Sequence, residues 1–129
     1  MPELPEVETI RRKLVHGDVS IPSIIGAEII NAEVFWEGSV AEPNIEEFLF
    51  IISNTIIKDI NRRGKYFLFA ISDRFLVMHL RMSGDLNLTP VNEAAPKYSR
   101  VIFTLNNGYH LNFIDSRKFG RVWVVTDPE

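Results

Sequence analysis

The first fifteen residues carry apolar side chains at spacings of three and four, namely at Leu4, Val7, Ile10 and Leu14. This spacing places them along one face of a helix, so a helix is predicted over residues 2–15. Its carboxylates come first and its basic residues last, which complements the helix dipole. Pro5 fits because it lies in the opening turn, and Gly17 is predicted to end the helix.

Beyond residue 25 the pattern changes to short apolar runs that are typical of strands. The predicted strands are 26–36, 55–63, 65–72, 74–82, 85–89, 100–105, 109–115 and 121–125. A short helix is predicted over residues 45–53, with Asn44 as its cap. Asn107-Gly108 is a strong hairpin signal. The predicted fold is mainly β (α+β): a two-sheet antiparallel β-sandwich with an N-terminal helix and one short helix.

Composition indicates a single globular domain. The chain has 129 residues, of which 46% are hydrophobic and 24% are charged. Its apolar runs are shorter than the roughly 18 residues that a membrane helix needs, and the acidic start does not resemble a signal peptide. We therefore expect a cytoplasmic protein without a membrane partner. The chain lacks cysteine, and its three histidines are far apart, so no disulfide, metal or cofactor is expected.

Charge is distributed unevenly along the chain. The net charge of −3 argues weakly against a nucleic-acid partner. However, six glutamates and no basic residue lie in residues 28–47, whereas basic residues gather in 58–65 and 117–121. We expect one acidic and one basic face, and the basic face could bind DNA.

The N-terminus could itself be reactive. If Met1 is removed, Pro2 becomes a secondary amine, and α-amines have pKa values of roughly 7.7–8.0. Attack of this amine on a sugar carbon gives a permanently cationic iminium, which is covalent catalysis of the Schiff-base kind. Glu3 is well placed to move protons. The same residues equally suit a plain first helical turn, and spacing alone favours that structural interpretation.

Four motifs resemble the formamidopyrimidine-DNA glycosylase family. They are PELPEVETIRRKL at the N-terminus, RRGKYFLF at 62–69, HLRMSGDL at 79–86 and DSRKFG at 115–120. The resemblance covers the whole chain and implies a base-excision repair enzyme. Such an enzyme removes oxidised purines (8-oxoguanine, formamidopyrimidine) from double-stranded DNA and cuts the strand by β,δ-elimination. It also implies a nucleoid-associated location.

The resemblance implies a role for each matching residue. Pro2 matches the nucleophile, Glu3 the general acid/base and Lys65 a lysine that contacts the backbone and assists the sugar chemistry. Glu6 matches a pocket carboxylate near the lesion, and His79 a phosphate contact. The remaining matches are Met82, Arg117 and Phe119, which would fill the gap that the flipped nucleotide leaves. An apolar wedge and an arginine that pairs with the orphaned base suit that task.

Taken singly, these residues have plainer interpretations: Met82 as core, Phe119 as a buried turn aromatic, and His79 as a strand histidine. Three alternatives to the purine-specific enzyme therefore stand. One is a non-catalytic β-sandwich that binds DNA or protein, another is an endonuclease VIII-like enzyme for oxidised pyrimidines, and the third is a domain without a ligand.

The resemblance also implies parts that these 129 residues lack. The family has a helix–two-turn–helix module and a four-cysteine zinc finger after its first domain. We therefore expect residues 1–129 to be an N-terminal catalytic domain with weak activity or none alone. Both its oligomeric state and the fate of Met1 are left open by the sequence.

Overall fold

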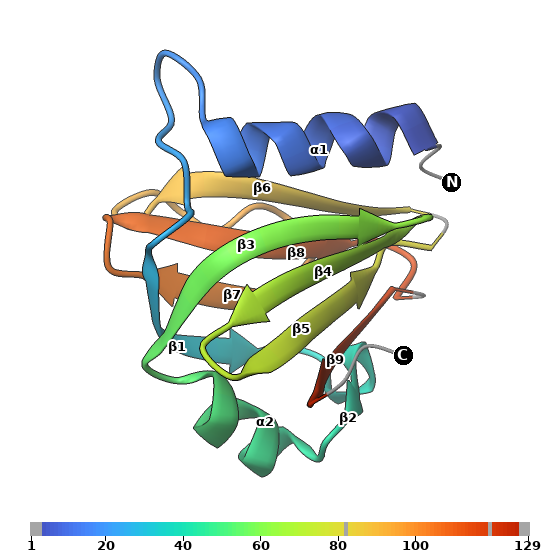
Figure 1. Cartoon of the computed structure of the whole chain (residues 1–129). Helices are drawn as coiled ribbons and strands as arrows, with labels where there is room; N and C mark the ends of the chain where they lie inside the picture. The colour runs from blue at the N-terminus through green and yellow to red at the C-terminus, as the bar shows by residue number, and fades with distance from the viewer. Residues whose placement is uncertain (1–3, 82, 119, 127–129) are drawn as a thin grey trace.

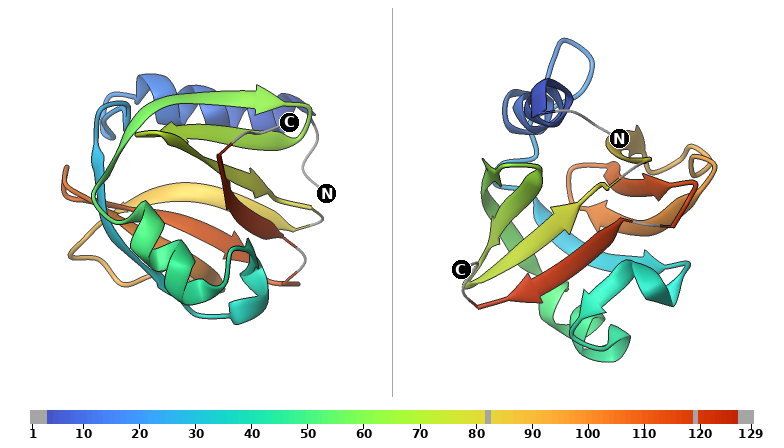
Figure 2. Two further views of the ribbon diagram at one scale, coloured as in Figure 1. Left: turned by 60° about the horizontal axis from the view of Figure 1, so that its bottom comes forward. Right: turned by 90° about the vertical axis from the view of Figure 1, so that its right-hand side faces the viewer.

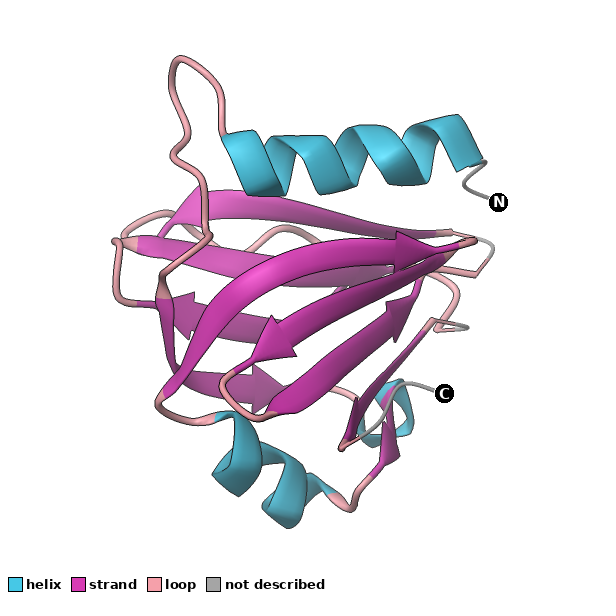
Figure 3. Ribbon diagram, viewed as in Figure 1, coloured by secondary structure: helices cyan, strands magenta, loops and turns pink. Residues whose placement is uncertain are grey.

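The computed structural model of the protein describes residues 4–81, 83–118 and 120–126, and this part of the chain is mostly β-structure (Figure 1, Figure 3). Its helices are α1 (Leu4–His16), the 3-10 turn η1 (Glu37–Ser39) and α2 (Ile45–Ile52). Its strands are β1 (Glu28–Val34), β2 (Val40–Glu42), β3 (Thr55–Arg63), β4 (Tyr66–Ile71), β5 (Arg74–His79), β6 (Gly84–Pro90), β7 (Ser99–Leu105), β8 (Tyr109–Asp115) and β9 (Arg121–Val125).

Both predicted helices are present, and their ends follow the predicted signals. Gly17 follows α1 with φ of +69°, and its N–H donates to the carbonyl of Lys13 at 2.8 Å. A side chain there would meet the carbonyl oxygen of Ile21 at 2.6 Å, so only glycine fits. At α2, the Asn44 side chain accepts a hydrogen bond from the N–H of Glu47 at 3.0 Å.

The strands form one continuous sheet, which corrects the expectation of two separate sheets. Its order is β2-β9-β5-β4-β3-β1-β7-β8-β6, and every pair is antiparallel except β2 with β9. The join is β1, whose first residues pair with β3 while the rest of the strand pairs with β7. The sheet curls at β1, so that its two halves face each other in two layers (Figures 1 and 2).

The core lies between these two layers. Alternate residues of β4 point inward, which buries Phe67, Phe69 and Ile71. Phe103 and Phe113 from β7 and β8 are also fully buried. Burial of a side chain of this size contributes roughly 1.5–3 kcal/mol, so these aromatic residues are a major stabilising contribution.

Helix α1 lies across the top of the two layers, above β3 and β6 (Figure 1). Its inward face buries Val7 and Leu14, two residues of the predicted apolar stripe. The guanidinium of Arg11 donates to the carbonyl of Ile60 on β3 at 3.2 Å. These contacts fix the helix against the sheet.

Candidate active site

The N-terminal end of α1 and three turns lie at the same end of the molecule (Figures 1 and 2). The turns join β3 to β4, β5 to β6 and β8 to β9. The first and last of these turns carry Lys65 and Arg117, and His79 ends β5 directly before the second turn. Glu6 lies in the first turns of α1. The fold therefore gathers predicted site residues from four distant parts of the sequence. Pro2, Glu3, Met82 and Phe119 lie outside the described residues.

The β3–β4 turn presents the predicted lysine. Gly64 has φ of +59°, a left-handed conformation that reverses the chain directly before Lys65. The Arg62 guanidinium donates to the carbonyl of Gly64 at 3.1 Å, which closes the turn. Lys65 itself is partly buried. Its charge is close enough to lower the pKa of His79.

A cluster of three arginines around Glu8 ties this turn to α1. Arg11 and Arg12 reach Glu8 from the next turn of the helix, at 2.7 and 2.9 Å. Arg62 reaches it from β3, at 2.9 Å. The hydrogen bonds from Arg11, Arg62 and Arg12, in that order, hold the pKa of Glu8 well below its ordinary value. Glu8 therefore stays ionised and joins the helix to the strand that leads to Lys65.

The His79 ring is held in a fixed orientation at the end of β5. Its Nδ1 accepts the N–H of Arg81 at 3.0 Å, and its ring packs edge-on to Tyr66 at 4.4 Å between centroids. Burial lowers its pKa, and the positive charges of Arg81 and Lys65 lower it further. With Nδ1 accepting, the proton of the neutral ring lies on Nε2, which can donate to an anion.

Arg81 also explains why β5 is shorter than predicted. Its φ of +57° breaks the extended conformation, so the strand ends at His79 rather than continuing to residue 82. The segment that follows is a turn that returns the chain to β6.

The β8–β9 turn is the second basic segment of this end. Arg117 and Lys118 are both exposed. Lys118 Nζ lies 5.3 Å from the centre of the Trp36 ring, and the Arg121 guanidinium lies 5.4 Å from it. Both cations therefore lie within cation–π range of one aromatic ring, which holds the turn against η1. No feature of the sequence associates Trp36 with this turn.

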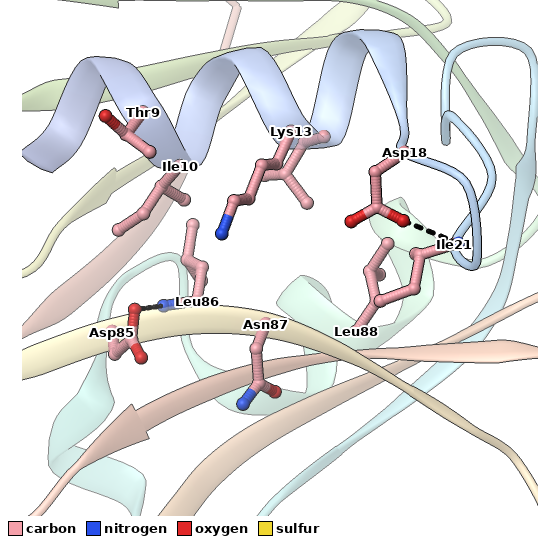
Figure 4. A pocket seen from close by; sticks show the side chains of 10 residues that line it. Thr9, Ile10, Lys13, Asp18, Ile21, Asp85, Leu86, Asn87 and Leu88 are labelled. Carbon is pink, nitrogen blue, oxygen red and sulfur yellow. Dashed lines mark hydrogen bonds between the residues drawn. The ribbon is translucent and has the colours of Figure 1, made fainter.

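Glu6 borders a groove between α1 and β6. It lines a hollow together with Pro5, Thr9, Ile10 and Asp85. The groove continues along the helix into a cavity of about 250 Å³, into which Lys13 points between α1 and β6 (Figure 4). The predicted pocket carboxylate thus lies beside a real depression next to the N-terminal end of α1.

Asp115 is a residue of this end to which the sequence assigned no role. It is fully buried at the end of β8, where its side chain accepts hydrogen bonds from Ser83, Arg117 and Gly120. The signal that could have identified it is an aspartate at the end of an apolar strand. Aspartate is rarely buried without such partners.

The described residues contain neither a metal-type cluster of side chains nor a helix that could span a membrane. Within 4–81, 83–118 and 120–126, no three side chains of the His, Cys, Asp or Glu type are grouped as a metal site requires. In the same part of the chain, neither helix has the length and apolar composition needed to span a bilayer.

Comparison with known sequences identifies the family. The model of the formamidopyrimidine-DNA glycosylase N-terminal domain matches residues 1–122. The formamidopyrimidine-DNA glycosylase of Protochlamydia amoebophila is 41% identical over all of this chain and 45% of its own length. That of Lactiplantibacillus plantarum is 42% identical with the same coverage. The chain thus spans a little less than half the length of these relatives.

Solved structures agree with this. MutM in complex with DNA containing carbocyclic 8-oxo-G has a TM-score of 0.86 and 34% identity, over 96% of this chain and 44% of that one. The Lactococcus lactis Fpg (MutM) in complex with Fapy-dG DNA has a TM-score of 0.85 and 33% identity, over 95% of this chain and 44% of that one. The chain belongs to the formamidopyrimidine-DNA glycosylase family, and it corresponds to that family's N-terminal domain.

Proposed function

We propose that this chain is the N-terminal catalytic part of a bifunctional DNA glycosylase/AP lyase that removes oxidised purines from double-stranded DNA. The observation that carries the proposal is the convergence of the α1 N-terminal end with the turns that bear Lys65, Arg81 and Arg117. Such an enzyme acts on nucleoid DNA in the cytoplasm and needs no metal in this part of the chain.

The proposed reaction begins at Pro2. Its secondary amine attacks C1′ of the damaged nucleotide, and the base leaves with the electrons of the glycosidic bond and a proton. The bond between C1′ and the ring oxygen then breaks, and the ring oxygen takes its electrons and a proton while the proline nitrogen forms a double bond to C1′. The resulting iminium acidifies the protons on the neighbouring sugar carbon. Glu3 moves protons in these steps, and Lys65 assists at the sugar. Successive β- and δ-elimination then break the strand on both sides of the sugar.

The remaining residues have proposed roles in holding DNA. His79 would donate from Nε2 to a phosphate, which agrees with the hydrogen bond that its Nδ1 accepts from Arg81. Glu6 would contact the flipped lesion from the edge of its groove. Met82, Arg117 and Phe119 would occupy the space that the lesion leaves, because stacking lost on flipping costs a few kcal/mol.

Borohydride trapping tests the catalytic proposal. A duplex with one abasic site is incubated with the chain and sodium borohydride, and the covalent adduct is measured on a denaturing gel. We expect an adduct with the natural chain and at least about tenfold less with Pro2→Gly, which lacks the secondary amine. Intact-mass measurement must show that Met1 is absent, since an acylated proline nitrogen cannot attack. DNA binding that persists without any adduct would instead support the non-catalytic alternative.

Lesion choice needs its own comparison. One solved Lactococcus lactis Fpg structure is described as a complex with DNA containing an oxidised pyrimidine. Duplexes with 8-oxoguanine, formamidopyrimidine and an oxidised pyrimidine should therefore be compared in one assay. We expect purine lesions to be processed faster, and faster processing of the pyrimidine would favour the endonuclease VIII-like alternative.

The relatives are more than twice as long as these 129 residues, and this difference affects the rate of turnover that we expect. Because residues 1–129 correspond to only 45% of the first relative, they supply only part of its DNA contacts. Each phosphate contact that is missing weakens binding and lowers its salt dependence. We expect these 129 residues alone to turn over damaged duplex far more slowly than a full-length relative.

A further inference from the structure

Asp115 is a buried carboxylate that bonds to two different loops. Its Oδ1 accepts from the hydroxyl of Ser83 at 2.5 Å and from the N–H of Arg117 at 3.1 Å. Its Oδ2 accepts from the N–H of Gly120. The side chain is fully shielded from solvent. A buried carboxylate is tolerated when several donors satisfy its oxygens, and here a hydroxyl and two backbone N–H groups do so.

The two loops come from distant parts of the sequence. Ser83 belongs to the turn between β5 and β6, and Arg117 and Gly120 belong to the turn between β8 and β9. Gly84, the first residue of β6, pairs with Asp115 of β8, so the first turn ends directly beside this carboxylate. Asp115 is therefore the point at which the two turns are joined.

Close packing leaves the second loop little freedom at its end. A Cβ atom on Gly120 would lie 2.6 Å from Phe113 Cζ and 3.0 Å from Asp115 Oδ2. Each loop also contains a non-glycine residue in the left-handed region, Arg81 at φ +57° and Lys118 at φ +62°. Such conformations are unfavourable and persist only where the surroundings hold them.

We propose that Asp115 is a positioning residue that fixes the β5–β6 and β8–β9 turns relative to each other. The inference rests on the proposed function, in which these turns reach into the DNA at the site of the flipped base. Among the described residues, Arg117 is the one that this arrangement positions. Its backbone N–H donates to Asp115, while its side chain lies on the exposed surface. A gap left in a duplex has a fixed width, so residues that enter it from two loops must be held at a matching separation.

The test compares Asp115→Asn with a matched control, Asn112→Ala. Asparagine keeps the size of Asp115 but turns one acceptor into a donor that faces an N–H group. Asn112 lies on the same strand and is equally buried, but it donates to Asn87 and Thr89 at 3.0 Å, both on β6. Both changes disturb a buried polar group, and only the first touches the two turns.

Two measurements decide the outcome. Amide hydrogen exchange should become about tenfold faster at Arg117 and Gly120 in Asp115→Asn, which corresponds to one lost hydrogen bond. Preference for a tetrahydrofuran-containing duplex over an undamaged duplex should fall by about as much. Asn112→Ala should leave both quantities unchanged. Unchanged exchange in Asp115→Asn, or an equal change in the control, would overturn the proposal.

The two arms keep this proposal separate from the proposed function. If the natural chain binds the damaged and undamaged duplexes equally, that result counts against the proposed function. Hydrogen exchange needs no DNA, so it still tests whether Asp115 joins the two turns. If Asp115→Asn does not fold, Ser83→Ala removes one of the three donors and spares the carboxylate. We then expect a loss of damage preference of about threefold with the fold intact, and an unchanged preference would overturn the proposal.

Discussion

Arg62 Nε lies 2.9 Å from Glu8 Oε1, although the two residues are 54 positions apart in the chain. The same arginine donates to the carbonyl of Gly64, directly before Lys65. One side chain therefore connects α1, which leads back to the chain's N-terminus, with the turn that carries the predicted lysine. This connection and the other contacts of the site lead to four predictions.

Glu8→Gln should make the protein less sensitive to acid. The arginines lower the pKa of Glu8 in the folded protein, so the folded state binds fewer protons than the unfolded state. The stabilisation is therefore fully present above about pH 4.5, the ordinary value, and is lost as the pH falls towards the lowered value. Urea unfolding measured from pH 6 to pH 3 should show a smaller decline for Glu8→Gln than for the natural chain. Equal declines would show that solvent screens the cluster, as it does for many surface ion pairs.

Lys65→Ala should weaken DNA binding and change its dependence on salt. If Lys65 contacts a phosphate, its loss should reduce the slope of log K against log salt concentration by about one. The control is Lys58→Ala, because Lys58 is exposed in the middle of β3 and away from the turn. Fluorescence anisotropy at several salt concentrations measures both slopes. The same slope for both variants would place Lys65 outside the DNA contact.

His79 should titrate below its ordinary pKa of 6.5, mainly because of burial and also because of the charges of Arg81 and Lys65. A lowered histidine pKa means that the folded state resists protonation. Its contribution to stability is thus present above about pH 6.5 and is lost as the pH falls through the lowered pKa. NMR titration of the ring protons measures the midpoint, and Lys65→Met should raise it. A midpoint at or above the ordinary value would contradict the packed, oriented ring.

Gly120→Ala and Gly64→Ala should both destabilise the protein, for different reasons. At Gly120 the new methyl group would overlap Phe113 Cζ, and overpacking typically costs about 1–3 kcal/mol. At Gly64 there is nothing within 4 Å, so only the left-handed φ of +59° opposes the change, at roughly 1–2 kcal/mol.

Replacing each glycine by asparagine instead of alanine separates these two causes. Gly64→Asn should recover part of the loss, because asparagine tolerates the left-handed region. Gly120→Asn should be worse than Gly120→Ala, because it adds volume where atoms already meet. The denaturant midpoints of all four variants measure their stability. If asparagine is more stable than alanine at both positions, the close packing around Gly120 is contradicted.

Much of the local structure could be predicted from the sequence. The three- and four-residue spacing of Leu4, Val7, Ile10 and Leu14 predicted α1, and Gly17 ends it. Asn44 caps α2, and Gly108 lies in the β7–β8 hairpin turn. These features depend on neighbours within a few residues, which is why the pattern of side chains predicts them. The motifs also indicated the family, which the match over residues 1–122 confirms.

Pairing between distant segments was decided only by the tertiary structure. Residues Glu28–Val34 read as an ordinary strand, yet this strand pairs with both β3 and β7 and turns two expected sheets into one. Likewise, nothing near Arg62 in sequence shows that it bonds to Glu8, and nothing near Asp115 shows that it joins two turns. By itself, the sequence determined which residue types the site contains, because they form local motifs. Their arrangement was decided by the fold, because packing of the two layers brings distant turns to one end of the molecule.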